Sequence, residues 1–468
     1  MWKNKPGKFL AHRENNFFTN VFLKTFNNKF VHSWPSPKQI SKKKLQIRGR
    51  KFYFCTMISL KPVQTLRIPE FRNLMTGRFF LVLSFRMLAT LMGWWIYKLT
   101  KDPFAIGLIG LSEVIPAVST ALYAGHVIDN SEKKRLLLIC NYAYVFLISL
   151  LLLPALFGHK LLHLSNVEIS YFIYAVIFFT GFCRAFIGPI IPSMIPKIVT
   201  RAELPNAITL NQATFLTASV FGHALGGFLI HWIDISGTIM VVVGLMIFSS
   251  LFFWFLEKHP SENTESEIGV VQSMREGLAY IYKTKEILGA LFLDMFAVLF
   301  GGAVAMIPVF ATDILKVGAE GFGLLNAAAD IGSMCIIITL AFVPLTKNQG
   351  KILLVAVAGF GICIIGFGLS ELYWLSFILL VFSGMLDGIS VVIRGTIVQL
   401  KTPDYIRGRV LSVNSIFIMS SNEMGQFESG LAAKLMGVVR SVIFGGTMTV
   451  LIAAVVAAKV PKLRKMNY

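Results

Sequence analysis

The sequence predicts an all-α polytopic membrane protein, with twelve transmembrane helices in two six-helix bundles. Three observations predict this fold class. The chain of 468 residues is 55% hydrophobic and 15% charged, with a mean hydropathy of +0.69, whereas soluble domains are about 45–50% apolar and about 25% charged. Apolar runs long enough to cross a bilayer recur along the chain. One long polar stretch divides these runs into two equal sets.

Each predicted span is an apolar run of about 20 residues between charged, proline or glycine breaks. The first bundle, 57–256, has spans at 78–98, 104–127, 136–157, 169–190, 208–232 and 237–256. The second bundle, 287–460, has spans at 287–311, 322–343, 351–370, 373–397, 409–433 and 440–459. The bundles are joined by a cytoplasmic linker, 257–286, which includes an amphipathic surface helix. One face of that helix carries Met274, Leu278, Ile281 and Tyr282.

The two ends of the chain lie outside the predicted bundles. Residues 1–56 carry 13 Lys or Arg and one acid, Glu14, and they lack the apolar segment of about 7–15 residues that a secretory signal requires. We interpret 1–56 as a basic disordered leader: either a translated region upstream of a native start at Met57, or a disordered tail. Residues 461–468 are expected to form a short cytoplasmic tail.

Basic residues are unevenly divided between the two alternating sets of loops. Eighteen lie in one set and six in the other. Lys and Arg accumulate in cytoplasmic loops, so the richer set, the linker and both termini are predicted to face the cytoplasm. The net charge of +20 would indicate nucleic-acid binding on a soluble chain. In a membrane protein the positive-inside rule accounts for it, and we expect no nucleic-acid partner.

The sequence lacks the motifs of common enzymes. It contains no G-x-x-x-x-G-K-[ST], no H-E-x-x-H and no G-x-S-x-G, and no segment between spans is long enough for a catalytic domain. The five cysteines are widely spaced and four lie in apolar runs, so we interpret them as small hydrophobic residues. We expect no enzymatic activity, no metal and no cofactor.

The two halves show a weak internal repeat. Residues 201–227 align without a gap on 404–430. In this alignment Asn211 corresponds to Asn414, Gly222 to Gly425 and Gly227 to Gly430. Spans two and eight can also be aligned, and there Gly107 corresponds to Gly323. Such a repeat predicts two parallel bundles related by an axis along the membrane normal, with a central cavity near the midplane.

Several loops carry recognisable motifs. AGHVIDNSEKKRLLL (124–138) follows the second span with a Gly, an acid four residues later and a basic cluster. On this segment, and on PSMIPKIVTRAELPNA (192–207), PDYIRGRV (403–410) and EGLAYI (276–281), the chain resembles the major facilitator superfamily. Within it, the chain is similar to the twelve-span branch of drug, macrolide and siderophore exporters that includes the enterobactin exporter. The resemblance covers about residues 66–460.

The resemblance implies a monomeric transporter of the bacterial inner (plasma) membrane. It would bind a small-molecule substrate, with protons as the coupling ion. The loop motif implies a conformational clasp at the inner face that stabilises the outward-open state. Its residues would be Gly125, Asp129, Lys133, Lys134 and Arg135. The alternative is that the three basic residues serve only the positive-inside rule. In GHALGG (222–227), His223 stands where the family's fifth-span motif has proline.

Charged side chains inside predicted spans are candidates for function, because a charge at the bilayer centre costs at least about 2.5–3.5 kcal/mol. The candidate proton or substrate site comprises Glu113, Arg86, Arg184, Asp294, Asp330, Asp387 and Glu423. Glu113 lies deep in span two, and its alternative role is to pair with Arg86 or Arg184. Arg394 is interpreted as a structural partner of Asp387, and His223 as an interhelical hydrogen-bond partner. The candidate helix-packing glycines are Gly222, Gly226, Gly227, Gly425 and Gly430.

Three functions fit these features. The first is proton-coupled efflux of a small amphiphilic molecule by alternating access, in which the two bundles rock about a central site. The second is a nutrient importer or uniporter of the same fold. The third is a non-transporting membrane receptor or assembly factor.

Overall fold

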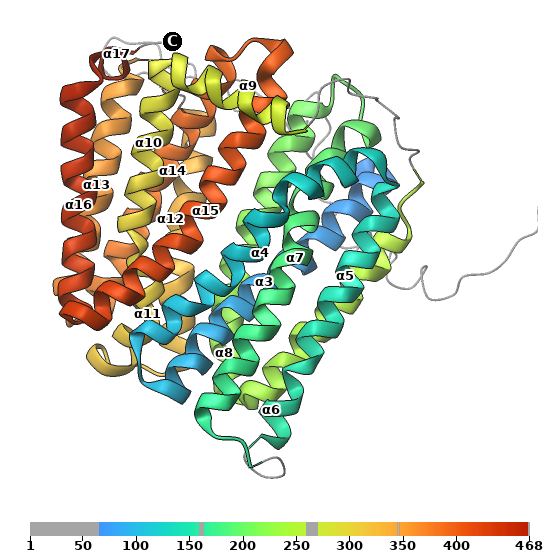
Figure 1. The fold of residues 1–468 in the computed structure, drawn as a ribbon, viewed down its shortest axis with the longest axis vertical. Helices are drawn as coiled ribbons and strands as arrows, with labels where there is room; N and C mark the ends of the chain where they lie inside the picture. The colour runs from blue at the N-terminus through green and yellow to red at the C-terminus, as the bar shows by residue number, and fades with distance from the viewer. Residues whose placement is uncertain (1–64, 159–162, 259–269, 344, 346, 467–468) are drawn as a thin grey trace, which may run out of the picture. The chain divides into compact units, whose positions relative to one another are not determined.

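The computed structural model describes residues 65–468 except 159–162, 259–269, 344, 346 and 467–468, and those residues are almost entirely helical (Figure 1). The predicted leader, 1–56, lies outside the described residues. The first bundle comprises η1 (Thr65–Arg67), α3 (Pro69–Thr100), α4 (Pro103–Asn130), α5 (Lys133–Leu150), α6 (Leu152–Phe157), α7 (Asn166–Ile198) and α8 (Leu204–Trp254).

The linker and the second bundle are also built of helices. The linker helix is α9 (Val270–Lys283). The second bundle comprises α10 (Lys285–Phe300), η2 (Gly302–Met306), α11 (Ile307–Val309), η3 (Phe310–Ile314), α12 (Ala319–Phe342), α13 (Gln349–Leu369), α14 (Tyr373–Lys401), α15 (Asp404–Met436), α16 (Val438–Lys459) and α17 (Pro461–Arg464). We call the end that carries α9 and α17 the linker end, and the opposite end the far end (Figure 1).

Local sequence signals set where several helices begin. Asp102 precedes α4, and its side chain accepts a hydrogen bond from the Phe104 backbone N–H at 3.0 Å. Pro103 then occupies the first turn of α4, where its missing N–H costs nothing. Ser165 and Glu168 form a reciprocal capping box at the start of α7. These caps satisfy backbone N–H groups that the helix itself leaves unpaired.

The helix α8 contains two predicted spans. Ile233 and Asp234 have non-helical backbone angles, and Asp234 has a φ of 59°. Gly222 lies against Leu83 of α3, whereas Phe253 lies against Gly77, only six residues away from Leu83. A straight helix would separate Gly222 from Phe253 by about 46 Å. The chain therefore reverses at Ile233–Asp234, and the two parts of α8 are spans five and six.

Ten helices of the described chain are long and apolar enough to cross a membrane by length and composition alone. The prediction of twelve differs for two physical reasons. The reversal in α8 hides one span, because two helical spans follow each other there with only Ile233 and Asp234 departing from helical backbone angles. The 33-residue α15 is not among the ten, because polar residues interrupt its apolar sequence. These include Asn414, Asn422, Glu423, Gln426 and Glu428.

Three predicted segments have different local structure from the one expected. Span seven does not continue as one helix beyond Phe300. Gly301 and Gly302 follow it, and the chain goes on as η2, α11, which contains Pro308, and η3. Span three breaks at Leu151, three residues before Pro154. The tail at 461–466 is not loose, because Leu463 is fully buried and the Gly350 backbone N–H donates to the Met466 carbonyl at 3.3 Å.

Two pairs of helices join the bundles through glycine contacts. A Cβ built on Gly430 of α15 would lie 2.8 Å from the Cα of Gly107 on α4. A Cβ built on Gly227 of α8 would lie 2.7 Å from the Cα of Gly323 on α12. The sequence repeat superimposes Gly227 on Gly430 and Gly107 on Gly323. The two contacts are therefore equivalent under the repeat, and each allows two backbones to meet closely.

Candidate functional site

The charged residues of the spans gather in three clusters. The first joins α4 to α7 and lies beside α15. The second joins α3 and α8 of the first bundle to α12 of the second. The third lies within the second bundle, between α10 and α14. The first two clusters bring residues of both bundles near each other, and the third does not.

The first cluster is built on an ion pair between Glu113 and Arg184. Gly181 lets α7 approach α4 here, because a Cβ at Gly181 would lie 2.8 Å from the Glu113 carbonyl oxygen. The Arg184 side chain is 37% exposed and that of Glu113 is 14% exposed. Glu423 of α15 is within electrostatic range of Arg184 and Arg86. The structure thus pairs Glu113 with Arg184, one of the two partners that the sequence offered, and places Glu423 of the other bundle near this pair.

Aromatic rings flank both guanidinium groups of this cluster. The Arg184 guanidinium lies 5.8 Å from the centroid of the Phe85 ring, and that of Arg86 lies 5.2 Å from the centroid of the Phe215 ring. Cation–π attraction of this kind holds an arginine without neutralising it. Arg184 therefore contacts both the Glu113 carboxylate and an aromatic ring, and Arg86 lies over a second ring.

The second cluster links the bundles through Asp330 of α12. The Ser219 hydroxyl of α8 donates to an Asp330 carboxylate oxygen at 2.5 Å, and His223 Nε2 lies 3.7 Å from the same oxygen. The other ring nitrogen of His223 is hydrogen-bonded to the Thr90 hydroxyl at 2.8 Å. His223 is therefore the interhelical hydrogen-bond partner that the sequence indicated. It also faces an acid of the opposite bundle.

The third cluster lies inside the second bundle. Asp294 of α10 forms an ion pair with Arg394 of α14, and both side chains are 9% exposed. Arg394 Nη2 lies 3.9 Å from an Asp387 carboxylate oxygen, and Arg394 Nε donates to the Ser390 carbonyl at 3.2 Å. One arginine therefore holds two carboxylates, as the spacing of Asp387 and Arg394 suggested.

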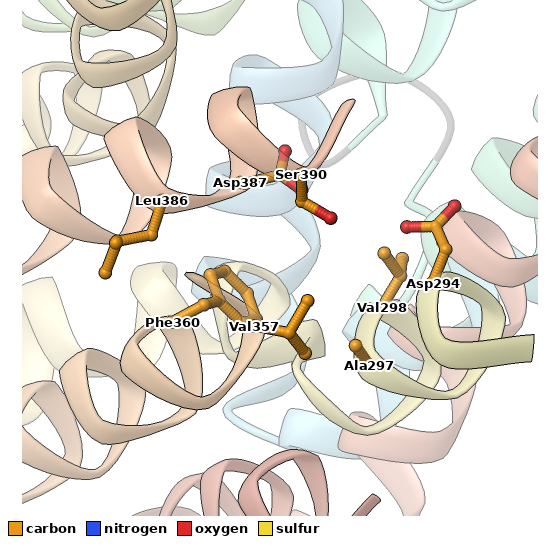
Figure 2. Close-up of a pocket in the computed structure, with 8 residues that line it drawn as sticks. All are labelled: Asp294, Ala297, Val298, Val357, Phe360, Leu386, Asp387 and Ser390. Carbon is orange, nitrogen blue, oxygen red and sulfur yellow. The ribbon is translucent and has the colours of Figure 1, made fainter. Parts of the chain in front are cut away.

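A small cavity adjoins this third cluster (Figure 2). Asp294 and Asp387 line it from α10 and α14, together with apolar residues that include Val357 and Phe360. Its volume of about 10 Å³ is close to the minimum that one water molecule needs. Asp294 and Asp387 thus border a mainly apolar cavity that is too small for an organic substrate.

The predicted clasp residues lie at the linker end of the first bundle. A Cβ built on Gly125 meets no atom within 4 Å. Lys134 Nζ donates to the Leu256 carbonyl at 2.6 Å, Lys133 is buried and Arg135 is exposed. The side chain of Asp129 lies outside the described part of the structure. In this state Lys134 thus binds the end of α8 within its own bundle.

Contacts between the bundles that the described residues make lie toward the far end. Lys434 pairs with Asp102 at 3.4 Å, and the Tyr97 hydroxyl donates to Asp313. Trp94 stacks on Phe322 with ring centroids 5.4 Å apart. None of these three contacts was predicted from the sequence. Charged residues at helix ends carry no sequence signal for a partner 332 positions away.

The helix-packing glycines all lie at close helix contacts. Gly222 and Gly226 lie against α3, Gly425 lies against α10, and Gly227 and Gly430 join the bundles. A Cβ at Gly222 would lie 2.6 Å from the Arg86 Cβ, and one at Gly425 would lie 2.9 Å from the Val298 carbonyl oxygen. These contacts are too close for any larger side chain without a shift of the helices.

Two helical bundles, joined by paired helices and with charged groups gathered between them, define a transporter of the major facilitator type. The chain belongs to the family described as "Transmembrane secretion effector", whose model matches residues 61–468. Its members are membrane transporters of this superfamily.

Known proteins of the same superfamily are similar over most of the chain. The enterobactin exporter EntS of Citrobacter koseri is 22% identical over 414 residues, which cover 85% of this chain and 94% of that protein. The MFS-type transporter YkuC of Bacillus subtilis is 24% identical over 356 residues, or 70% and 76% of the two chains. The solved D-xylose–proton symporter superimposes with a TM-score of 0.66 at 13% identity, covering 87% of this chain and all of that one. That likeness shows the fold alone.

Proposed function

We propose that this transporter exports a small amphiphilic molecule, of the drug, macrolide or siderophore class, in exchange for protons. The exporter relatives at 22% identity support the direction of transport. The acids and bases that meet between the bundles support the coupling, because ionisable residues within membrane spans mark substrate and proton pathways.

One observation carries the coupling proposal: Asp330 is bonded across the bundle interface. Its carboxylate accepts from Ser219 and faces His223, so its charge favours the state in which α8 and α12 are close. A proton on Asp330 would remove that charge and weaken the hydrogen bond that the carboxylate accepts from Ser219. Because a ligand shifts a conformational equilibrium only through its different affinity for the two states, a proton bound here would bias the carrier.

The first cluster supports the substrate class. Arg86 and Arg184 present guanidinium groups beside the rings of Phe215 and Phe85, and Glu423 faces them. Guanidinium planes and aromatic rings together bind ligands that are both aromatic and anionic. We propose that this cluster binds substrate and that Asp330 binds the proton.

The remaining predicted features enter this proposal as follows. The far-end contacts hold the bundles together in the state described here, and the clasp at Gly125 and Asp129 would act in the opposite state. We place the transporter in the bacterial inner membrane as a monomer, with both termini in the cytoplasm. Reporter domains fused to each terminus test this, since reporters on opposite faces would contradict it.

The experiment that tests the function has two stages. First, overexpression in a strain that lacks its own efflux pumps is screened for growth against drugs, macrolides and iron-chelating compounds. Second, a compound that gives resistance is assayed in proteoliposomes with and without an imposed pH gradient. We expect the gradient to accelerate substrate movement. Movement that ignores the gradient would contradict proton coupling, and uptake in place of resistance would contradict export.

A further inference from the structure

A groove opens at the linker end of the second bundle, away from the three charged clusters. It lies between the start of α10, the end of α16 and α17, and its volume is about 530 Å³. Lys285, Lys459 and Lys462 line it, and the described residues of its lining include no Asp or Glu. All three lysines are exposed. The groove is therefore a concentrated positive site on the side of the bundle.

Basic and apolar side chains occupy different depths of this groove. Lys285 begins α10, and Leu288 and Phe292 follow three and seven residues later on the same helix face. Phe292 thus lies about 10 Å further along the helix axis than Lys285. On α16, Val456 lies about one turn before Lys459. The lysines are therefore at the helix ends, and the apolar residues lie further along the helices, away from those ends.

The wall that carries Lys462 is fixed by packing. Leu463 is fully buried, and the Met466 carbonyl accepts from the Gly350 backbone N–H at 3.3 Å. Gly289 brings α10 and α16 together, because a Cβ there would lie 3.1 Å from Val460 Cγ1. The backbone positions of the three lysines are thereby set, so binding an anion requires ordering only their side chains.

We propose that the groove binds an anionic phospholipid. The three lysines would bind the phosphate and head group, and an acyl chain would lie along Leu288, Phe292 and Val456. Phe292 is 47% exposed and Tyr282 is 65% exposed, so both offer surface to lipid, and tyrosine favours the level of the head groups. Basic pockets between transmembrane helices recognise anionic head groups. A zwitterionic lipid fits less well, because its amine would meet the same three charges.

Native mass spectrometry of the full chain, titrated with phosphatidylglycerol or phosphatidylcholine, tests the proposal. The test variant is Lys285→Gln/Lys459→Gln/Lys462→Gln. A matched control removes three exposed basic residues outside the groove lining, as Arg201→Gln/Lys258→Gln/Lys347→Gln. A third variant replaces the three groove lysines by arginine and so preserves the charge.

We expect the wild type, the control and the arginine variant to retain phosphatidylglycerol in preference to phosphatidylcholine. The glutamine variant should bind it roughly a hundredfold more weakly, since each lysine near an anionic surface contributes about 1 kcal/mol. Equal affinity in the glutamine variant and the control would overturn the proposal. Displacement of the lipid by inorganic phosphate alone would indicate a small-anion site instead. A dimer that only the glutamine variant loses would indicate a contact between copies.

Discussion

The two bundles differ in the charge that they bring into the membrane. Away from the helix ends, the described spans of the first bundle contribute Arg78, Arg86 and Arg184 against one acid, Glu113. Those of the second contribute Asp294, Asp330, Asp387, Glu423 and Glu428 against Arg394. Solvent access differs too: the Arg184 side chain is 37% exposed, whereas Arg394 and Asp294 are each 9% exposed. Similar ion pairs therefore suit different tasks, the accessible one for transport and the buried one for holding a bundle together.

The strongest test of this contrast is Arg394→Met in the second bundle. Removing the guanidinium leaves Asp294, which is 9% exposed, without its ion-pair partner, and removes the cation that also lies near Asp387. Breaking a buried pair costs about 3–5 kcal/mol, so we expect a large fall in thermal stability, measured by fluorescence-detected unfolding in detergent. The further change Asp294→Asn should recover part of the loss. A single variant as stable as the wild type would refute the structural role of this pair.

A second test acts on the contact between the bundles. In Gly227→Leu the new side chain meets the backbone of Gly323, and overpacking costs about 1–3 kcal/mol. We expect the far end to open, because separation of the bundles relieves the clash. Spin labels at Lys98→Cys and Lys316→Cys, in a cysteine-free background, would report a longer distance. Gly244→Leu, also in α8, is the control because a Cβ at Gly244 meets nothing within 4 Å. The same distance in both variants would contradict the proposed contact.

Arg184→Met tests the more exposed ion pair, which lies in the first bundle. Because the Arg184 side chain is 37% exposed whereas that of Arg394 is 9% exposed, we expect a smaller loss of thermal stability than in Arg394→Met. Substrate transport should nevertheless fall at least about tenfold, if the guanidinium binds substrate, since a charged hydrogen bond is worth about 1.5–3 kcal/mol. The measurement is transport rate and unfolding temperature on one preparation. Stable protein with wild-type transport would remove Arg184 from the site.

The smallest effect is expected at the far-end pair. Lys434 and Asp102 are 52% and 39% exposed, and exposed pairs contribute about 0.2–1 kcal/mol. Lys434→Ala should lower the unfolding temperature slightly, and high salt should abolish the difference because it screens exposed charges. A large loss that persists in high salt would mean that this pair controls closure.

The spans and their division into two bundles could be predicted because apolar length is a local property of the sequence. Where that property fails, as in α15 with Glu423 and Gln426, the helix packs closely against a second helix. Gly110 of α4, for example, would bring a Cβ within 2.8 Å of the Gln426 Cβ. The break of span seven near Gly301 and Gly302 was not predicted, although adjacent glycines are a turn signal, because the apolar residues on both sides form one run of span length.

The individual residues of the candidate site could be predicted from the sequence, but the contacts between them could not. The cost of burying charge singled out Glu113, Arg184 and Asp330. Periodicity could not show that Asp330 meets Ser219, because the two are 111 positions apart on different bundles. Ser219 and Thr90 carried no signal, since hydroxyls in membrane helices commonly bond to their own backbone.

The central claim is that Asp330 at the bundle interface couples proton movement to transport, whereas Asp294 within the second bundle does not. It is tested most directly by comparing Asp330→Asn with the wild type in two proteoliposome assays, using a compound identified in the resistance screen. We predict that Asp330→Asn retains exchange of labelled for unlabelled substrate, which requires no net proton movement, but loses accumulation driven by a pH gradient. Accumulation at the wild-type rate in Asp330→Asn would contradict the account.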